Sequence, residues 1–220
     1  MKIITLNLWG GKVHDPLIEF LKQTAVDTDV FCFQELTFPQ FSSEIGEILV
    51  DFSAFTHLAP VKKKIGQGIF VKKNIPVAER GGFSCFPHIT TANFNYVVVR
   101  DICIGNLHGL MEKHTKLDTP HRVEQSIILE EFLVKRTEDK ILVGDFNELP
   151  KTHSMMILEH GMRDLDKEYG LTTTRTSHYH GAHHKHLSDY ILASPGIIVR
   201  RFEMLPDEVS DHAPLMVDIG

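Results

Sequence analysis

The stretch Ile141-Leu142-Val143-Gly144-Asp145-Phe146-Asn147 passes from an apolar run directly into a polar end. The apolar run predicts a buried strand over Lys140–Val143. Side chains at positions i and i+2 of a strand lie on the same face, so Asp145 and Asn147 are expected to point together at the end of a sheet. A carboxylate beside a carboxamide can orient a water molecule or a phosphate oxygen. The tetrapeptide Gly144–Asn147 is also typical of a β-turn, in which Asp and Asn occur for backbone reasons.

Apolar runs of the same kind recur along the chain and alternate with amphipathic segments. Helices are predicted over Pro16–Val26, Phe38–Phe52, Pro120–Lys135 and Thr152–His160, with Asp15 and Thr119 as N-caps of the first and the third. The region from Ser53 to Leu107 is almost entirely of β type, and the predicted strands are Lys2–Leu8, Asp29–Phe33, Gln67–Lys73, Tyr96–Arg100, Ile102–Leu107, Lys140–Val143, Asp189–Ala193, Ile197–Leu205 and Leu215–Ile219. Two β-layers covered on the outside by helices satisfy this order, in a single domain over residues 1–220.

The composition is that of an ordinary globular protein. Of 220 residues, 42% are hydrophobic and 24% charged, which excludes long disorder as the main state. No stretch approaches the roughly 18 consecutive apolar residues of a membrane span. The first residues, MKIITLNLWGGKVHD, become polar too early to form the apolar region of a signal peptide. The three cysteines, Cys32, Cys85 and Cys103, form no CxxC pair. We therefore expect the protein to lie in the reducing environment of the cytoplasm, without membrane association. We also expect it to be a monomer.

The chain is mildly acidic. Lys and Arg number 23 against 29 Asp and Glu, which gives a net charge of −6 with His neutral. A protein that holds nucleic acid by bulk charge needs a positive surface, so this balance does not favour nucleic acid as the partner. A nuclease is not excluded, because a bound divalent cation can supply positive charge locally.

Polar residues that carry chemistry lie at the ends of six β-type segments. Besides Asp145 and Asn147, they are Asn7, Gln34-Glu35, Asn106–Gly109, Ser188–Tyr190 and Ser210–His212. Each piece alone is compatible with a turn, a solvated carboxylate or a buried histidine. Together they place oxygen and imidazole ligands at strand ends, which is how a sheet scaffold presents a site.

This set of pieces resembles the endonuclease/exonuclease/phosphatase superfamily. The matching pieces are LNLW (Leu6–Trp9), QE (Gln34-Glu35), NLHG (Asn106–Gly109), GDFN (Gly144–Asn147), SDY (Ser188–Tyr190) and SDH (Ser210–His212), in the family's order and over nearly the whole chain. The resemblance implies a four-layer α/β/β/α sandwich, in which helices cover two mixed β-sheets and the site lies at one edge of the paired sheets.

The resemblance also implies a magnesium or manganese site. Glu35 resembles the family's principal metal ligand, with Asn7 and Asp211 close to the cation. An oxygen-donor site with few carboxylates leaves positions for water and substrate phosphate, which suits Mg²⁺ or Mn²⁺.

Catalytic roles follow from the same resemblance. Asp145 matches the residue that orients or deprotonates the attacking water, and Asn147 the residue that hydrogen-bonds the phosphate. His212 matches the catalytic imidazole and Asp189 the carboxylate that orients it, a pairing that raises the imidazole pKa. His108 matches a second phosphate-contacting histidine. Arg122 is expected to bind substrate, although Asp118-Thr119-Pro120-His121-Arg122 is also typical of a helix start.

The implied activity is metal-dependent hydrolysis of a phosphoester by in-line attack of water on phosphorus. The alternatives are a DNA or RNA nuclease of the repair type and a non-catalytic binding domain of the same fold. Leu36-Thr37 follow Glu35 where abasic-site endonucleases usually have Thr-Lys. We interpret the stretch before Asp189 as one without the Arg and aromatic residues that would contact a nucleic acid strand. A small phosphoester is therefore expected to be a better substrate than duplex DNA.

One segment admits three interpretations. Ser177–Leu187 holds histidines at 178, 180, 183, 184 and 186. It can be a solvated loop at the site, a source of phosphate-contacting imidazoles, or a structural zinc site, for which its spacing is poor. The lysines at 62–64 and 72–73 are interpreted as solvated hairpin ends.

Overall fold

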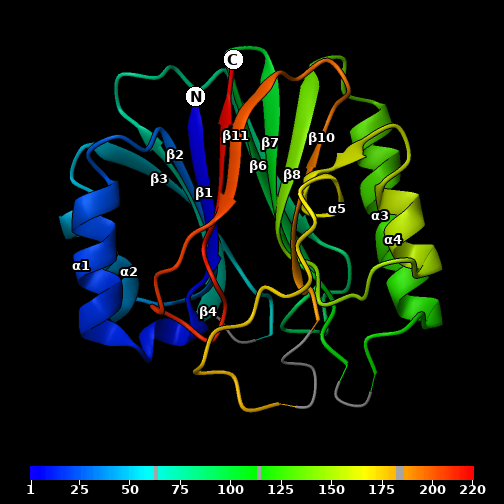
Figure 1. Cartoon of the computed structure of the whole chain (residues 1–220), viewed down its shortest axis with the longest axis horizontal. Coiled ribbons are helices and arrows are strands. Elements are labelled where there is room, and N and C mark those ends of the chain that lie inside the picture. The colour runs from blue at the N-terminus through cyan, green and yellow to red at the C-terminus, as the bar shows by residue number, and fades with distance from the viewer. Residues whose placement is uncertain (62–63, 113–114, 182–185) are drawn as a thin grey trace.

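The computed structural model describes residues 1–61, 64–112, 115–181 and 186–220. Its strands form two six-stranded sheets (Figure 1). The strands are β1 (Lys2–Asn7), β2 (Val30–Thr37), β3 (Phe52–Leu58), β4 (Ile65–Lys72), β5 (Glu79–Ser84), β6 (Asn93–Val99), β7 (Ile102–His108), β8 (Asp139–Asp145), β9 (Arg163–Asp164), β10 (Asp189–Ala193), β11 (Val199–Met204) and β12 (Leu215–Ile219). Their orders are β11-β12-β1-β2-β4-β3 and β5-β6-β7-β8-β10-β9. Each sheet is mixed, because β1 and β2 are parallel in one and β7 and β8 in the other.

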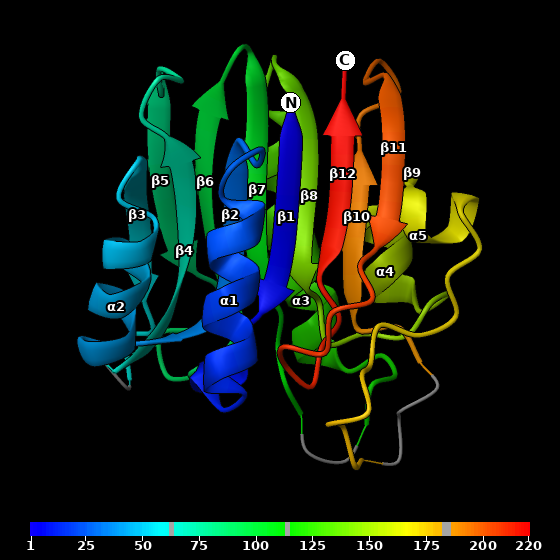
Figure 2. The same ribbon diagram turned by 60° about the vertical axis from the view of Figure 1, so that its left-hand side comes forward.

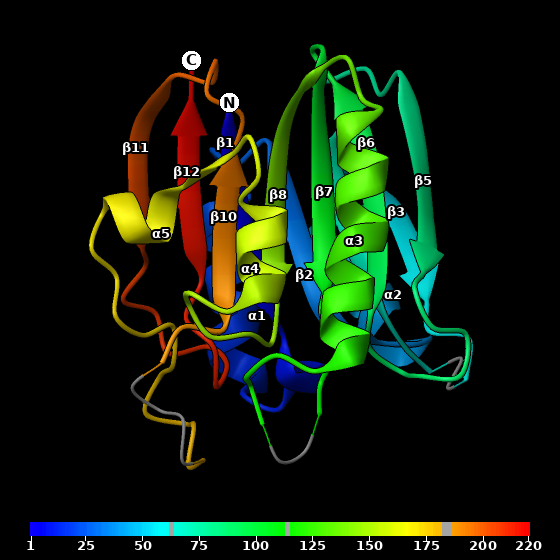
Figure 3. The ribbon, with the colours of Figure 1, turned by 90° about the vertical axis from the view of Figure 1, so that its right-hand side faces the viewer.

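Helices cover the outer face of each sheet. The helix pair α1 (His14–Thr24) and α2 (Gln40–Ile48) lies on the first sheet (Figure 2). On the second sheet lie α3 (Pro120–Val134) and α4 (His153–Leu158) (Figure 3). A 3-10 turn, η1 (Trp9–Gly11), and the short helix α5 (Leu165–Glu168) complete the elements of the described residues. The four-layer α/β/β/α sandwich that the sequence implied is thus confirmed.

Side chains at alternate positions of a strand pack into different layers of the sandwich. On β1, Ile3 joins the core between the two sheets, whereas Ile4 and Leu6 pack outward with residues of α1 and α2. On β2, Phe31 and Phe33 face the same helices, and all five side chains are fully buried or nearly so. Side chains alternate between the faces of a strand, so sheets buried on both faces need continuous apolar runs of this kind.

The layer between the sheets becomes polar toward one end of the strands. Gln34 Nε2 of the first sheet donates to Asn106 Oδ1 of the second at 2.6 Å. Gln67 Nε2 of the first sheet donates to Asn95 Oδ1 of the second at 2.7 Å. These buried bonds tie the two sheets together, so the strand ends beyond them are held in fixed relation.

Several local predictions are corrected. α1 begins at His14, and its N-cap Val13 makes no side-chain bond, so Asp15 lies within the first turn instead of capping it. α2 ends at Ile48 because the chain turns into β3 at Phe52. β9 and α5 were not predicted, because two and four residues are too few for periodicity to show. The Thr119 cap is confirmed, since its Oγ1 accepts from the backbone N–H of Arg122 at 3.2 Å.

In the part of the chain that the structure describes, no helix combines the length and the apolar character needed to cross a membrane. Lys62, Lys63, His183 and His184, which figured in the sequence interpretation, lie outside the described residues.

Candidate active site

The polar strand ends converge because of the strand register. β1 and β2 pair in parallel with Asn7 opposite Gln34, which places Glu35 next to Asn7. In the second sheet, Asp145 at the end of β8 is the pairing partner of both His108 on β7 and Asp189 on β10. The two groups therefore lie at the same end of the sandwich, below the sheets in Figure 1.

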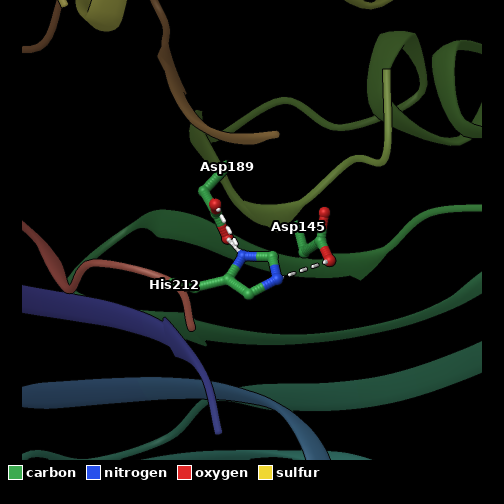
Figure 4. Close-up of side chains that lie close together, drawn as sticks. All are labelled: Asp145, Asp189 and His212. Carbon is green, nitrogen blue, oxygen red and sulfur yellow. Dashed lines mark hydrogen bonds and ion pairs between the residues drawn. The ribbon is translucent and has the colours of Figure 1, made fainter. Parts of the chain in front are cut away.

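His212 lies between two carboxylates (Figure 4). Its Nδ1 is 2.9 and 2.8 Å from the two carboxylate oxygens of Asp189, and its Nε2 is 3.7 Å from Asp145 Oδ2. Thr174 Oγ1 donates to Asp189 Oδ2 at 2.6 Å and fixes that carboxylate in turn. Burial by itself lowers the pKa of the imidazole, but the negative charges of Asp189 and Asp145 outweigh it and raise that pKa. The two carboxylates therefore orient the ring and raise its pKa, whereas Arg175 Nη1, a donor against Nε2, opposes protonation of that nitrogen.

Asp145 is a buried carboxylate with several donors. Its Oδ1 accepts from Ser188 Oγ at 2.7 Å and from the backbone N–H of Asn147 at 3.0 Å, and its Oδ2 accepts from Asn7 Nδ2 at 3.0 Å. Burial by itself raises the pKa of this carboxyl, but the charges of His212, Arg175 and Lys116 outweigh it and hold that pKa well below its usual range. Asp145 is therefore ionised and held in one orientation.

Asp145 and Asn147 meet through a turn and not along a strand. β8 ends at Asp145, and Asn147 has a φ of 58°, in the left-handed region that Asn tolerates better than most residues. The Asn147 side chain nevertheless returns to the site, with Nδ2 3.3 Å from Asp145 Oδ2. Their proximity was predicted, but the reason given for it, a shared strand face, is wrong.

Glu35 forms the other side of the site. Its Oε1 accepts from Asn7 Nδ2 at 3.2 Å and lies 3.8 Å from His108 Nε2, and its side chain is 34% exposed. Asp211 also borders the site, and burial raises the pKa of its carboxyl, with Glu35 adding to the effect. Two carboxylates that line one opening fit a hard divalent cation bound through oxygen.

Asn7 contacts the carboxylates of Glu35 and Asp145 through its side-chain nitrogen. Its Nδ2 faces Glu35 and Asp145, and its Oδ1 accepts from the backbone N–H of Trp9 at 3.0 Å. In this orientation Asn7 fixes the two carboxylates and does not offer them an oxygen. Its role as a direct metal ligand stays a prediction.

Asp145, Asp189 and His212 also offer ligand atoms within 4.8 Å of one another, a spacing that a metal ion can bridge. His212 Nδ1 is engaged by Asp189, however, and the imidazole has a raised pKa, so a cation there would compete with the ring proton. Asp189 and His212 are thus already bonded to each other, whereas the Glu35 carboxylate is partly exposed at the pocket.

A pocket of about 330 Å³ opens onto these groups. Of the predicted site residues, Glu35, Asp145, Asn147, Asp211 and His212 line it. Asn7, Asp189 and His108 lie behind this wall, and each is fully or almost fully buried. The structure thus places His108 against Glu35 and not at the pocket surface, so contact between His108 and phosphate stays a prediction.

Arg122 does not reach the pocket. It is 1% exposed, its Nη1 donates to the carbonyl of Leu117 at 2.9 Å, and its Nη2 donates to that of Leu110 at 3.3 Å. Asp118 accepts from the backbone N–H groups of His153 and Ser154 and so holds the start of α4. The expected substrate contact of Arg122 is corrected to an internal role, because its Nη1 and Nη2 both donate to the loop that follows β7.

Lys116, Arg175 and Tyr179 are among the residues of the pocket wall that sequence reasoning missed. Arg175 Nη1 contacts His212 Nε2, and its guanidinium lies 4.2 Å from the centre of the Tyr179 ring. The expectation that no Arg or aromatic residue precedes Asp189 near the site is therefore wrong. The available signal was an Arg within a polar segment, but only the bridge between Arg175 and His212 shows where that segment runs.

The histidine-rich segment contributes Tyr179, and none of its described histidines, to the pocket wall. Among its described residues no group of three metal-ligating side chains forms. His180 and His186 are exposed, as the solvated-loop interpretation expects.

Glu148, which follows Asn147, carries a prediction about stability. Burial raises the pKa of its carboxyl to about 7, against the smaller opposing effects of Ser154 and Arg122. The unfolded chain has a glutamate pKa of about 4.3. The native state therefore binds this proton more tightly, and the stability from it, complete below about pH 4, is lost as pH rises toward 7.

We expect Glu148→Gln to raise the free energy of unfolding by about 2–3 kcal/mol at pH 8 and by much less at pH 5. Urea unfolding at both pH values checks this, with the exposed Glu47→Gln as the matched control. Equal gains at the two pH values would contradict the assignment.

The chain is similar to known proteins in sequence and in structure. The family described as Endonuclease/Exonuclease/phosphatase matches residues 4–212. A search of curated proteins gave no match. Among solved structures, a mannosyl-6-phosphatase from Bacteroides thetaiotaomicron is 19% identical with a TM-score of 0.76, covering 100% of this chain and 99% of that one.

Two further structures are similar over 100% of this chain. TDP2 from D. rerio, complexed with a single-strand DNA product, is 18% identical with a TM-score of 0.79 and 98% of its chain covered. The 3' phosphatase NExo from Neisseria, bound to a product DNA hairpin, is 17% identical with a TM-score of 0.74 and 99% covered. At these identities the structures establish the shared fold.

Proposed function

Because this chain belongs to the Endonuclease/Exonuclease/phosphatase family, we propose that it is a hydrolase that cleaves a phosphoester by attack of water on phosphorus. The observation that carries the proposal is the buried array of Asp189, His212 and Asp145, of which His212 and Asp145 line a pocket that Glu35 also lines. A structural ion pair would not need an opening of about 330 Å³ beside it.

The charge of each residue determines its proposed role in the reaction. Asp145, which is ionised and immobilised, accepts a hydrogen bond from the attacking water and orients it. As the water oxygen bonds to phosphorus, the P–O ester bond breaks and the alcohol leaves with the proton that the water gives up. His212, held by Asp189 and with a raised pKa, faces the negative charge of the phosphate. The Asn147 amide, which lines the pocket, donates to a phosphate oxygen.

Glu35 and Asp211 would hold a divalent cation, with Asn7 fixing the Glu35 carboxylate. Mg²⁺ or Mn²⁺ bound there supplies Lewis-acid stabilisation of the charge on the transferred phosphoryl group. Oxygen donors and remaining open positions suit these two ions.

Activity is expected to vanish in excess EDTA and to return when Mg²⁺ or Mn²⁺ is added. Glu35→Gln removes a ligand charge and is expected to raise the metal concentration for half-maximal activity about 10- to 100-fold. Metal titrations of the wild type and of Glu35→Gln measure this, with the exposed Glu131→Gln as the control. Full activity in excess EDTA would refute the metal requirement.

A nuclease is retained as the second candidate, because Arg175 and Tyr179 in the pocket wall offer the cation and the aromatic face that a nucleotide would contact. Two arguments still favour a small substrate. The net charge of −6 attracts a polyanion weakly, and the pocket is at the small end for ligand sites.

We expect kcat/KM for small aryl phosphoesters to exceed that for duplex DNA in about 0.15 M salt, where exposed charges are screened beyond about 8 Å. A panel of aryl phosphate mono- and diesters, single-stranded DNA and plasmid DNA, each with Mg²⁺ and with EDTA, tests the proposed function and this preference together. Efficient duplex cleavage with negligible ester hydrolysis would favour the nuclease. Turnover of none of them would leave the non-catalytic alternative.

A further inference from the structure

The hydroxyl of Ser188 is the centre of a charged group that the catalytic roles above do not use. Ser188 Oγ accepts from Lys116 Nζ at 2.8 Å and from Arg175 Nη2 at 3.0 Å, and it donates to Asp145 Oδ1 at 2.7 Å. A hydroxyl has one proton and two lone pairs, so this partner set uses it fully and fixes the direction of each bond. Both cations are thereby held at the pocket wall.

We propose that Lys116 and Arg175 form a subsite for a non-bridging oxygen of the substrate phosphate, and that this subsite selects phosphate monoesters over diesters. The inference rests on the proposed phosphoesterase function and names the substrate class of that same pocket. Lys116 is then a substrate-binding residue additional to the predicted set.

The position of the subsite follows from the two oxygens of Asp145. Oδ1 faces Ser188 and, through it, Lys116 and Arg175. Oδ2 faces Asn7, which also contacts Glu35. Lys116 thus lies on the Oδ1 side of Asp145 and Glu35 on its Oδ2 side, while Nη1 of Arg175 also comes within 3.8 Å of Asp211 Oδ2. A phosphate that enters the pocket against Asp145 meets positive charge on both flanks.

The number of phosphate oxygens distinguishes the substrate classes. A monoester has three non-bridging oxygens and up to two negative charges, whereas a diester has two such oxygens and one charge. The flank at Glu35 and the donors Asn147 and His212 can serve two oxygens, which leaves the third for Lys116 and Arg175. In a diester an organic group would occupy that third position, and the N–H donors of the two cations that Ser188 does not use would have no phosphate oxygen to bind, which is costly in a partly desolvated site.

The surroundings of the two cations support this role. Burial lowers the pKa of the Lys116 ammonium, as expected for a lysine withdrawn from water. The Arg175 side chain is 5% exposed, and its Nε is buried without a hydrogen-bond partner among the described residues. Charge-assisted bonds to phosphate are strong in such surroundings.

The loop that carries Lys116 is anchored from α3. Arg122 donates to the carbonyls of Leu110 and Leu117, and Gln125 Oε1 accepts from the backbone N–H of Leu110 at 2.8 Å. Leu117 directly follows Lys116, so the buried guanidinium of Arg122 fixes the backbone beside it. Arg122 therefore supports phosphate binding from a distance, as a positioning residue.

Two measurements on the wild type, Lys116→Met and the control Lys135→Met test the proposal. Lys135 is an exposed lysine at the end of α3, remote from the pocket. The first is calorimetric titration with inorganic phosphate in the presence of Mg²⁺. The second is the ratio of kcat/KM for p-nitrophenyl phosphate to that for bis-p-nitrophenyl phosphate. Lys116→Gln, which keeps a donor for Ser188 without the charge, replaces Lys116→Met where the latter does not fold.

We expect Lys116→Met to weaken phosphate binding about 10- to 100-fold and to lower the monoester-to-diester ratio by a similar factor, with Lys135→Met like the wild type. Unchanged phosphate affinity, or equal losses on the two esters, would overturn the subsite. A wild type that binds phosphate but cleaves neither ester would refute the proposed function, and the binding data would still decide the subsite.

Discussion

His212→Ala is expected to lower kcat for phosphoester hydrolysis by about three orders of magnitude, and Asp189→Asn by nearly as much. Asp189 contacts His212 Nδ1 at 2.8 Å, and both side chains are buried. Asp189 therefore acts only through the imidazole, whose orientation and raised pKa it maintains. Without the ring, the carboxylate has nothing further to contribute.

The double variant is expected to be little slower than His212→Ala alone, because residues that act as one unit are not additive. Steady-state kcat for the four members of this cycle, at saturating substrate and Mg²⁺, is the measurement. His88→Ala, at an exposed histidine, is the control for the loss of an imidazole as such. Losses that multiply in the double variant would show that the pair is not coupled.

Asp145→Asn is expected to lower kcat about 10²- to 10⁴-fold with little change in fold. The substitution keeps the size of the side chain but removes the charge that His212, Arg175 and Lys116 stabilise. It also turns an amide N–H₂ toward one of the present donors, Ser188 or Asn7, and so disturbs the hydrogen bonds that hold the site.

Steady-state kinetics and thermal unfolding of Asp145→Asn check this prediction together. The exposed Asp101→Asn is the matched control and should retain wild-type kcat. An Asp145→Asn enzyme with wild-type kcat would exclude Asp145 from the handling of the attacking water.

The sequence was sufficient for most strands of the sheets, but not for β3, β5 and β9 or for the exact ends of the elements. Strands buried on both faces leave continuous apolar runs, which is why β1, β8 and β12 were predicted within a few residues. The start of α1 was misplaced, because Asp15 resembles a cap while the helix already begins at His14.

The structure brings predicted site residues together where they follow strand ends. The register of β7, β8 and β10 brings His108, Asp145 and Asp189 side by side, and a strand end is visible in sequence. Arg175 and Lys116 lie in irregular segments, whose path is set by contacts to Ser188 and His212. No period in the sequence encodes such a path, so these two residues required the three-dimensional structure.

Arg122 illustrates the opposite error, because a residue that was expected to contact substrate lies away from the pocket. A charged residue near a motif suggested a substrate contact, but its guanidinium satisfies backbone carbonyls inside the protein. Whether an arginine faces inward depends on which backbone oxygens lack other partners, and that is a property of the folded loop.

The destination of solvent oxygen tests the central claim most directly. A phosphoester is hydrolysed with Mg²⁺ in water enriched in the heavy oxygen isotope, by the wild type and by His212→Ala, and both products are analysed by mass spectrometry. If water attacks phosphorus in this pocket, the label enters the phosphate product and not the alcohol, and His212→Ala forms labelled product about three orders of magnitude more slowly. Label in the alcohol, or equally fast labelling by His212→Ala, would contradict the account.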